Sequence, residues 1–579
     1  MIALSRRKIV SRFLRNTVAA LCTCIGLANS PAVRAQTDGL LQINDPIHHF
    51  LVWQKLEGRL PWAFLGHQPL SVYEAQRYLD TVAVHSADLT DVERQLLGRY
   101  RGDTTLVSAR NLNRKARALY RNGIDFVSSK GEDFSIQLNP LLYLTGGYAN
   151  RSIERAGSKS YFTYQNTRGL RLSGAVGPTV FFESRIEENQ KVPGIPQFSK
   201  NTAPRLGNVK YNPGEDSMLS TAPYDYLIAT GVVGVRTKYF EFRFGRDRNL
   251  WGVGKSSTEL SNYSTVYDQL QIRTTVGRFQ YTNLFTGFGD LTDLPRSFPE
   301  TVRIPRKYGA FHRLAVNITN SMDLSLFEGV VFSDDSTRSG FDVAMLNPVI
   351  FYRAVERDQG SSANVVLGID YSWLVRPGFM TYLQVVIDEF KLSEVFHPNR
   401  GWWANKWSWM IGMQVADPIP GLKHVRMRAE YTRTRPFTFS HRVASQGYIH
   451  YEDLLAHPSG PNAEDIGVFF IYQPSERFFG ELNLSMTVRG RNSESTNFGS
   501  DPGVSYETRE SDFGHNILQG IPTNYVAFET HGGYELFPNL FFEGALLFEH
   551  FKDGVLGTDW YVAPIVTLRW GLPYQSLRY

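Results

Sequence analysis

Residues 423–434, KHVRMRAEYTRT, alternate between apolar and polar positions. The apolar positions are Val425, Met427, Ala429 and Tyr431. The polar positions between them are Arg426, Arg428, Glu430 and Thr432. A half-buried strand of a soluble sheet has this period of two, and so does a strand with one face in lipid and the other in water. This segment alone does not choose between the two.

The same period runs through most of the chain after Phe134 and predicts about eighteen strands, each about as long as a tilted barrel strand. The predicted strands are about 134–149, 161–174, 177–188, 226–237, 238–246, 269–277, 278–287, 308–319, 322–333, 363–375, 379–390, 405–417, 423–434, 465–474, 477–489, 524–535, 539–551 and 559–571.

The connections between these strands alternate strictly between short and long. Short turns such as Gly277-Arg278 and Asn320-Ser321 separate the long segments 189–225, 247–268, 288–307, 334–362, 391–404, 435–464 and 490–523. Outer-membrane barrels have short periplasmic turns and long outer loops, whereas a soluble sandwich has no reason to alternate. We therefore predict an all-β transmembrane barrel whose polar faces, including Asp388, Arg426, Arg428 and Glu430, line the lumen.

The segment before the strands has helical spacing instead. Residues 70–85 and 89–103 each place apolar residues on one side, with Ser71 and Glu74, then Thr90 and Glu93, at capping positions. These helices are too short to bury a core of their own. We expect a small periplasmic helical segment, residues 36–125, to dock against the barrel of residues 126–579.

The first 35 residues predict export. A basic stretch, an apolar stretch from Val18 to Leu27 and small residues before Gln36 form a secretory signal peptide with cleavage after Ala35. A lipoprotein site at Cys22 or Cys24 fits less well, because small residues do not precede either cysteine suitably. The predicted location is the outer membrane of a Gram-negative bacterium.

Removing the signal peptide changes the charge and the available chemistry. Six of the 61 basic and none of the 56 acidic residues lie in it, which leaves 55 basic against 56 acidic residues. No nucleic-acid partner follows from that balance. Both cysteines leave as well, which excludes disulfides and cysteine-based metal sites from the exported chain. We predict neither a metal nor another cofactor.

Catalytic motifs are weak throughout the sequence. GRDRNLWGVGKSS (245–257) has Asn249 where a phosphate-binding loop needs glycine, and it is better interpreted as an ordered outer loop with Trp251 packing inward. Asp388, Glu389, Glu481 and Glu543 could form a glycosidase pair, although pairing with inward arginines is the simpler interpretation. His441 with Ser440 or Asp453 lacks hydrolase spacing. We predict that the protein is not an enzyme.

Two predicted loops carry candidate ligand contacts. In HPNRGWWANKWSW (397–409), Trp402 and Trp403 could stack on sugar rings while Arg400 pairs with sugar carboxylates. Trp407 and Trp409 alternate into a strand and suit a membrane-interface girdle. The long loop 435–464 adds His441, Tyr451 and His457 as candidate polysaccharide contacts.

Several motifs in series resemble the capsule assembly Wzi family. They are FRFGRDRNLWGVG (242–254), MLNPVIFYRA (345–354), IDEF (387–390), AEYTRTRPFTFSH (429–441), YIHY (448–451) and HPSGPN (457–462). The resemblance implies an outer-membrane barrel that attaches capsular or other surface polysaccharide, with membrane lipid and the polysaccharide export machinery as further partners. Residues 189–222 depart from the family's pattern, so the resemblance does not carry over the identity of the polysaccharide.

One long segment suggests how the lumen is closed. LNPVIFYRAVERDQG (346–360) is too apolar for a free outer loop, and we predict that it folds into the lumen. Phe351 and Tyr352 would narrow the lumen, while Arg353 and Arg357 would add positive charge. A plugged lumen favours surface binding over transport. The alternative function is a channel or exporter for oligosaccharides or polysaccharide.

Overall fold

The computed structural model describes residues 39–102, 125–154, 157–192, 223–292, 294, 304–333, 347–348 and 363–575. The predicted signal peptide lies outside these residues.

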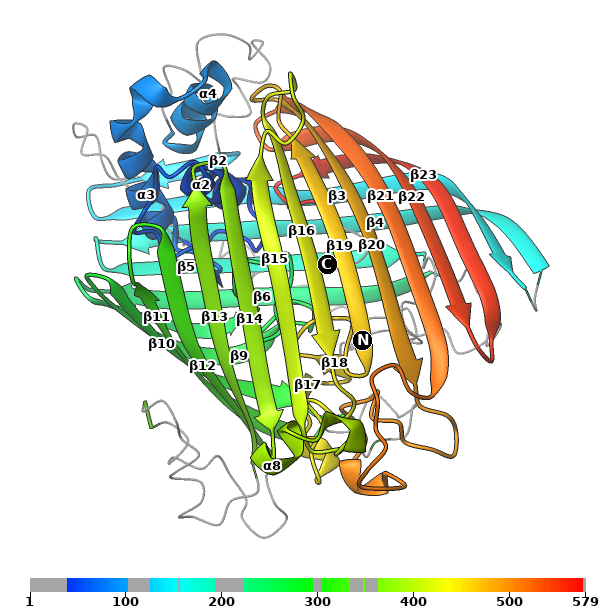
Figure 1. The fold of residues 1–579 in the computed structure, drawn as a ribbon. Helices are drawn as coiled ribbons and strands as arrows, with labels where there is room; N and C mark the ends of the chain where they lie inside the picture. The colour runs from blue at the N-terminus through cyan, green and yellow to red at the C-terminus, as the bar shows by residue number, and fades with distance from the viewer. Residues whose placement is uncertain are drawn as a thin grey trace, which may run out of the picture.

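Eighteen long strands of the described chain close into one antiparallel barrel, in which β23 pairs with β3 (Figure 1). They are β3 (Phe134–Ile153), β4 (Gly157–Val176), β5 (Val180–Lys191), β6 (Tyr224–Arg236), β7 (Phe240–Asp247), β9 (Tyr267–Val276), β10 (Phe279–Gly289), β11 (Arg306–Asn317), β12 (Met322–Ser333), β13 (Asn364–Arg376), β14 (Phe379–Glu389), β15 (Lys406–Ala416), β16 (Val425–Thr434), β19 (Ala463–Tyr472), β20 (Phe478–Arg491), β21 (Ile521–Phe537), β22 (Leu540–Asp553) and β23 (Gly557–Trp570). Short β2 (Val127–Lys130) pairs with the start of β3. The predicted fold class is confirmed, and every predicted strand has a counterpart within a few residues.

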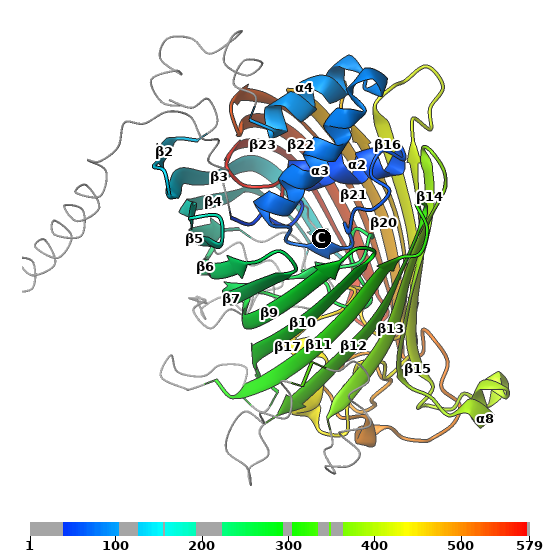
Figure 2. The same cartoon turned by 90° about the vertical axis from the view of Figure 1, so that its left-hand side faces the viewer.

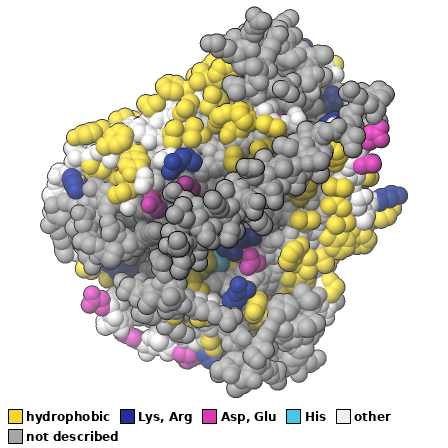
Figure 3. All heavy atoms as spheres, turned by 180° about the vertical axis from the view of Figure 1, so that it is seen from behind, with side chains coloured by type: hydrophobic (Ala, Val, Ile, Leu, Met, Phe, Trp, Pro, Cys, Tyr) yellow, Lys and Arg dark blue, Asp and Glu magenta, His cyan; other side chains and the backbone are white. Residues whose placement is uncertain are grey.

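Side chains alternate across the barrel wall as the sequence pattern predicts. On β7, Phe240, Phe242 and Phe244 are exposed outward, whereas Glu241 and Arg243 are buried inside. Hydrophobic side chains gather on the outer wall in the view of Figure 3. An apolar band of this kind is what lipid requires of a barrel.

Three helices lie at the end of the barrel where the strands are joined by short turns (Figure 2). They are α2 (Pro46–Leu56), α3 (Val72–Val84) and α4 (Asp91–Tyr100). Ser71 caps α3 by accepting from the Glu74 N–H, and Thr90 with Glu93 forms a capping box on α4, both as predicted. The first helix, α2, was not predicted. None of the helices within the described residues is both long and apolar enough to cross a bilayer.

The helices share a core and are fastened to the barrel's inner rim. Lys55 Nζ lies 2.8 Å from Asp323 Oδ2, and the Gly378 N–H donates to the Leu56 carbonyl at 2.8 Å. Arg426 on β16 donates to the His49 carbonyl at 3.0 Å. The predicted docking of the helical segment against a larger body is therefore observed, at the end of the barrel with the short turns.

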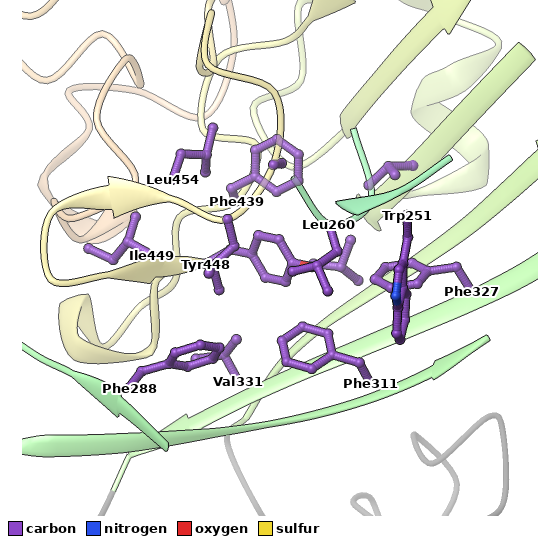
Figure 4. Close-up of a cluster of buried hydrophobic side chains, with 14 of the residues drawn as sticks. Trp251, Leu260, Phe288, Phe311, Phe327, Val331, Phe439, Tyr448, Ile449 and Leu454 are labelled. Carbon is purple, nitrogen blue, oxygen red and sulfur yellow. The ribbon is translucent and has the colours of Figure 1, made fainter. Parts of the chain in front are cut away.

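Two outer loops fold into the barrel and fill its other half. The loop after β7 contains β8 (Leu250–Trp251), and the loop after β16 contains β17 (Ile449–His450) and β18 (Asp453–Leu454). Their side chains form a buried cluster with inward-facing residues of β9–β14, which Figure 4 shows converging around Tyr448 and Trp251. Trp251 packs inward, as predicted.

Only Asn347 and Pro348 of the segment predicted to plug the lumen, residues 346–360, are among the described residues. Phe351, Tyr352, Arg353 and Arg357 lie outside the described residues. At its start, the Pro348 carbonyl accepts a hydrogen bond from the hydroxyl of Tyr281, which alternates on β10 with the inward-facing Gln280 and Thr282. Asn347-Pro348 therefore lies at the outer wall, so the prediction that the segment enters the lumen is wrong for these two residues.

A short antiparallel pairing inside the barrel joins the helical segment to an infolded outer loop. His67 and Gln68, which form β1, pair with Trp251 and Leu250 of β8. The Gly252 N–H also donates to the Gly66 carbonyl at 2.9 Å. The helical segment and the infolded loop after β7 are thus connected through backbone hydrogen bonds.

Acidification is expected to loosen this interior. Burial lowers the pKa of His48, His67 and His450 to about 4, and the positive charge of Arg273 adds to the effect at His67. Because the folded pKa lies below the unfolded value of about 6.5, stability is complete above pH 6.5 and is lost as the pH falls towards 4. Each imidazole accounts for roughly 3 kcal/mol by this linkage.

Denaturant unfolding of the purified protein between pH 8 and pH 4 measures this loss. His450→Gln should flatten part of the profile, whereas His397→Gln, at an exposed position, should leave it unchanged. A flat profile of the wild-type protein from pH 6.5 to 4 would contradict the prediction.

Candidate functional site

Three outer loops meet at the end of the barrel opposite the helices. The loop after β14 contains α8 (Leu392–Val395) and the 3-10 turn η4 (Pro398–Arg400), the loop after β16 contains η5 (Ala444–Gln446), and the loop after β20 contains η6 (Tyr506–Thr508). Gly514 and His515 donate to the carbonyls of Arg400 and Gly401 at 2.9 and 3.0 Å. Gly401 has φ 60°, and a Cβ there would lie 2.6 Å from the His515 nitrogen, so this junction requires glycine. The Phe437 N–H, after β16, donates to the Gly499 carbonyl at 2.8 Å, so all three loops form one surface.

Trp403 is the buried centre of this surface. Its ring lies 4.5 Å from the Tyr506 ring and 6.2 Å from the Phe437 ring, and the Arg509 guanidinium lies 4.0 Å from its centroid. Only 7% of Trp403 is exposed. Its ring is already covered, so the predicted direct contact with sugar does not fit. Trp403 instead holds the loops together.

Trp402 lies beside it at the surface and forms part of what we call the Trp402 patch: Lys391, Arg400, Trp402 and Phe513. The Trp402 and Phe513 rings are 5.0 Å apart, and 39% of Phe513 is exposed. Lys391 Nζ lies 4.9 Å from the centre of the Trp402 ring, and the Arg400 guanidinium lies 4.4 Å from that of Phe513. Cations therefore flank two adjacent aromatic rings.

The charges of the Trp402 patch are not balanced locally. Both Lys391 and Arg400 pair with the single buried carboxylate of Glu394, at 3.7 and 3.1 Å. More than half of each cationic side chain remains exposed. One positive charge is thus left to face solvent, where an anionic group could bind it.

A buried lysine fixes the base of the loops to the barrel. Lys406 Nζ lies 3.1 Å from Asp388 Oδ1 and donates to the Ser440 carbonyl at 3.0 Å. Asp388 also accepts from the Phe439 N–H at 2.7 Å. Asp388 points inward, as predicted, and there it joins the wall to an infolded loop.

The three candidates of the 435–464 loop are separated. His441 is buried near Tyr506, with ring centres 6.0 Å apart, and burial and the Lys406 charge lower its pKa to about 4. His457 is buried and its Nδ1 lies 2.8 Å from Ser459 Oγ. Tyr451 lies at the end of β10, where its N–H donates to the Gly289 carbonyl at 2.8 Å. Burial of both histidines is inconsistent with their predicted contact with an outer ligand.

Side chains of β16 face the lumen, as the opening pattern predicts. Glu430 accepts from the Lys255 N–H and the Tyr382 hydroxyl, each at 2.6 Å. Arg428 Nε lies 4.0 Å from Glu430 Oε1. These residues hold the infolded loop after β7 against the wall.

The hydrolase alternatives are not assembled within the described residues. Ser440 Oγ donates to the Phe437 carbonyl at 2.5 Å, and His441 Nδ1 accepts from the Val443 N–H at 3.2 Å, so the two side chains do not engage each other. Glu543 pairs with Arg569. No three His, Cys, Asp or Glu side chains of this part of the chain gather as metal ligands. The absence of catalysis and of a cofactor stays a prediction.

Sequence reasoning missed the contribution of the 490–523 loop. Tyr506, Arg509 and Phe513 all contact the tryptophan pair, although they lie about a hundred residues further along the chain. Within the sequence the loop was notable only for its length.

Comparison with known proteins agrees with this architecture. The solved structure of Wzi from Escherichia coli is described as an outer membrane protein involved in group 1 capsule assembly and as a carbohydrate-binding β-barrel. It has 11% sequence identity and a TM-score of 0.53, and the match covers 93% of this chain and 100% of that one. OccK8 (OprE) from Pseudomonas aeruginosa has 11% identity and a TM-score of 0.40, with 74% and 97% covered.

The sequence comparisons are more specific. No curated protein matches the chain significantly. The capsule assembly protein Wzi family matches residues 199–546, which is more than half of the chain and includes both infolded loops and the whole Trp402 patch. The chain therefore belongs to the capsule assembly protein Wzi family.

Proposed function

We propose that the protein binds an acidic surface polysaccharide at the Trp402 patch and so holds the polymer at the cell surface. The observation that carries this proposal is the pair of adjacent rings, Trp402 and Phe513, flanked by two cations that share one carboxylate. The patch lies at the outer end of the barrel, on loops fixed to one another through their backbones.

The chemistry of the patch suits a carboxylated sugar. Aromatic side chains offer a broad apolar surface to the C–H faces of sugar rings, and arginine pairs well with carboxylates. A single patch binds a short segment weakly, but a repeating polymer that contacts many copies of the protein is retained through avidity. Family membership and the carbohydrate binding described for the Escherichia coli protein support the same function.

The other partners follow from this role. Outer-membrane lipid would surround the apolar band, and the machinery that exports the polysaccharide would deliver the polymer to the outer face. Binding without turnover is part of the proposal. A channel would need an open path, whereas two infolded loops and three helices fill much of the barrel between the described strands.

Trp402→Ala tests the proposal. The substitution removes one stacking surface and the cation–π contact with Lys391, together worth about 1.4 kcal/mol, or tenfold in affinity per segment. We expect polymer to move from the cell surface to the medium while the total amount stays constant. The measurement is cell-bound against shed polysaccharide, with the amount of folded barrel in the membrane as reference.

Tyr239→Ala is a matched control. Tyr239 is exposed and has Lys238 Nζ 4.9 Å from its ring, but it lies in the turn between β6 and β7, at the periplasmic end. Its loss should leave retention unchanged. Normal retention by the Trp402→Ala variant would rule out the patch, and normal retention by a strain that lacks the protein would rule out anchoring altogether.

A further inference from the structure

A second feature lies at the opposite end of the barrel. A cavity of about 100 Å³, partly open to solvent, is enclosed between helices α2 and α4 and the inner wall formed by β16, β19, β20, β22 and β23. Its rim includes the turn between β19 and β20 and residues Pro573 and Tyr574. Lys255, at its inner end, comes from the infolded loop after β7.

The charges that line the cavity do not cancel. Three cations there have carboxylate partners: Arg99 with Glu535, Arg477 with Glu476 and Arg569 with Glu543. Lys255 and Arg426 also line the cavity, and neither forms an ion pair with any described residue. The remaining acid is Glu481. One positive charge is left in a partly buried space, where its attraction for an anion is stronger than in water.

The surroundings of Arg426 also show the excess of positive charge. Arg426 is held in place, because it donates to the His49 carbonyl at 3.0 Å and lies 4.8 Å from the centre of the Trp53 ring. Its Nε is buried without a hydrogen-bond acceptor among the described residues. The pKa of His49 is lowered well below its ordinary value by burial first, and further by the charges of Lys255 and Arg426.

Aromatic rings form the rest of the wall. Tyr100, Phe479 and Tyr574 line the cavity and are each only half-buried. They come from α4, β20 and the chain after β23, so they surround the space from different sides. Partly exposed rings beside free cations combine a surface for sugar C–H groups with a partner for a carboxylate.

We propose that this cavity is a periplasm-facing binding site for a short saccharide that carries a carboxylate. The carboxylate binds between Lys255 and Arg426, and the sugar rings lie against the half-buried aromatic side chains near the rim. The site is distinct from the Trp402 patch, which lies at the outer end. It does not depend on the function proposed for that patch.

Titration calorimetry on the full-length protein in detergent tests the site, with trigalacturonate as the charged probe and maltotriose as the neutral one. The protein should carry Trp402→Ala, so that binding at the outer patch does not contribute. We expect trigalacturonate to bind at least tenfold more tightly than maltotriose. Lys255→Met should remove at least tenfold of that affinity, and added salt should weaken it.

Two further variants show whether a loss of affinity comes from the positive charges inside the cavity. Lys423→Met removes a lysine whose side chain is 77% exposed in a periplasmic turn, and it should change nothing. Arg426→Lys retains the positive charge and should bind more tightly than Arg426→Met. Equal affinity for both probes, or an unchanged affinity in Lys255→Met, would overturn the proposal. Tighter binding of a glutamate-rich peptide than of trigalacturonate would assign the cavity to a protein partner instead and would also overturn it.

Discussion

Replacing Trp251 by alanine is expected to turn a closed barrel into one that conducts ions. Trp251 is completely buried in the cluster that fills the outer half of the lumen, and its ring lies 6.0 Å from that of Phe327 on the wall. Its backbone pairs with His67 of the helical segment. Truncating such a side chain costs about 3–5 kcal/mol, which is comparable with the stability of a local unit.

Planar-bilayer recording of the purified protein measures the effect. The wild-type protein should stay almost silent, and Trp251→Ala should show frequent openings. Trp409→Ala is the matched control, because Trp409 faces outward on β15 with its ring 5.3 Å from that of Tyr431. It should not conduct. Steady conductance by the wild-type protein would instead favour the channel interpretation of this barrel.

The barrel could be predicted from sequence because its signals are local. The alternation in Phe240-Glu241-Phe242-Arg243 and the length of each connection depend only on neighbouring residues and on the lipid. The caps at Ser71 and Thr90 are local for the same reason. Such features keep their meaning whatever the rest of the chain does.

Helix α2 was not predicted because it is buried on several sides, so its sequence lacks the amphipathic pattern of a surface helix. It is buried on several sides, with His48, Phe50, Leu51, Trp53, Gln54 and Leu56 all inside. A helix that packs on neighbouring helices and on the barrel rim has no solvent face, so its sequence shows no amphipathic period. Polar residues at buried positions, such as Gln54 beside Glu93, obscure it further.

Only the part of the candidate site that comes from the loop after β14 could be predicted from the sequence. Arg400, Trp402 and Trp403 are adjacent in sequence, and their residue types already indicate recognition of acidic sugars. Which tryptophan is exposed depends on Tyr506 and Arg509, which cover Trp403 from another loop. Contacts between distant loops leave no periodic signal. The same reason explains why the sequence did not show that the loops after β7 and β16 fill the lumen.

The attachment of helix α3 to the barrel wall gives the second large effect. Arg273 on β9 reaches Glu74 of α3 at 2.9 Å and Glu241 of β7 at 2.7 Å, and all three side chains are largely buried. Burial alone would raise the pKa of Glu74, but Arg273 and His67 hold it at about 2, so the pair is ionised. Removing one partner of a buried ion pair leaves an uncompensated charge and costs about 3–5 kcal/mol.

Arg273→Met should therefore loosen the helical segment from the barrel, with faster protease cleavage within residues 39–102 and a lower unfolding midpoint in denaturant. Arg246→Met is the control on the neighbouring strand β7, because Arg246 and Asp268 form a pair at 3.1 Å whose side chains are 40% and 54% exposed. Exposed pairs contribute about 0–1 kcal/mol. If both variants lost equally little stability, the helical segment would be held by its backbone and apolar contacts.

A double-mutant cycle of Glu74→Gln and Arg273→Met measures the ion pair directly. The buried pair predicts a clear coupling energy between the two substitutions, whereas a segment held only by backbone and apolar contacts would show none.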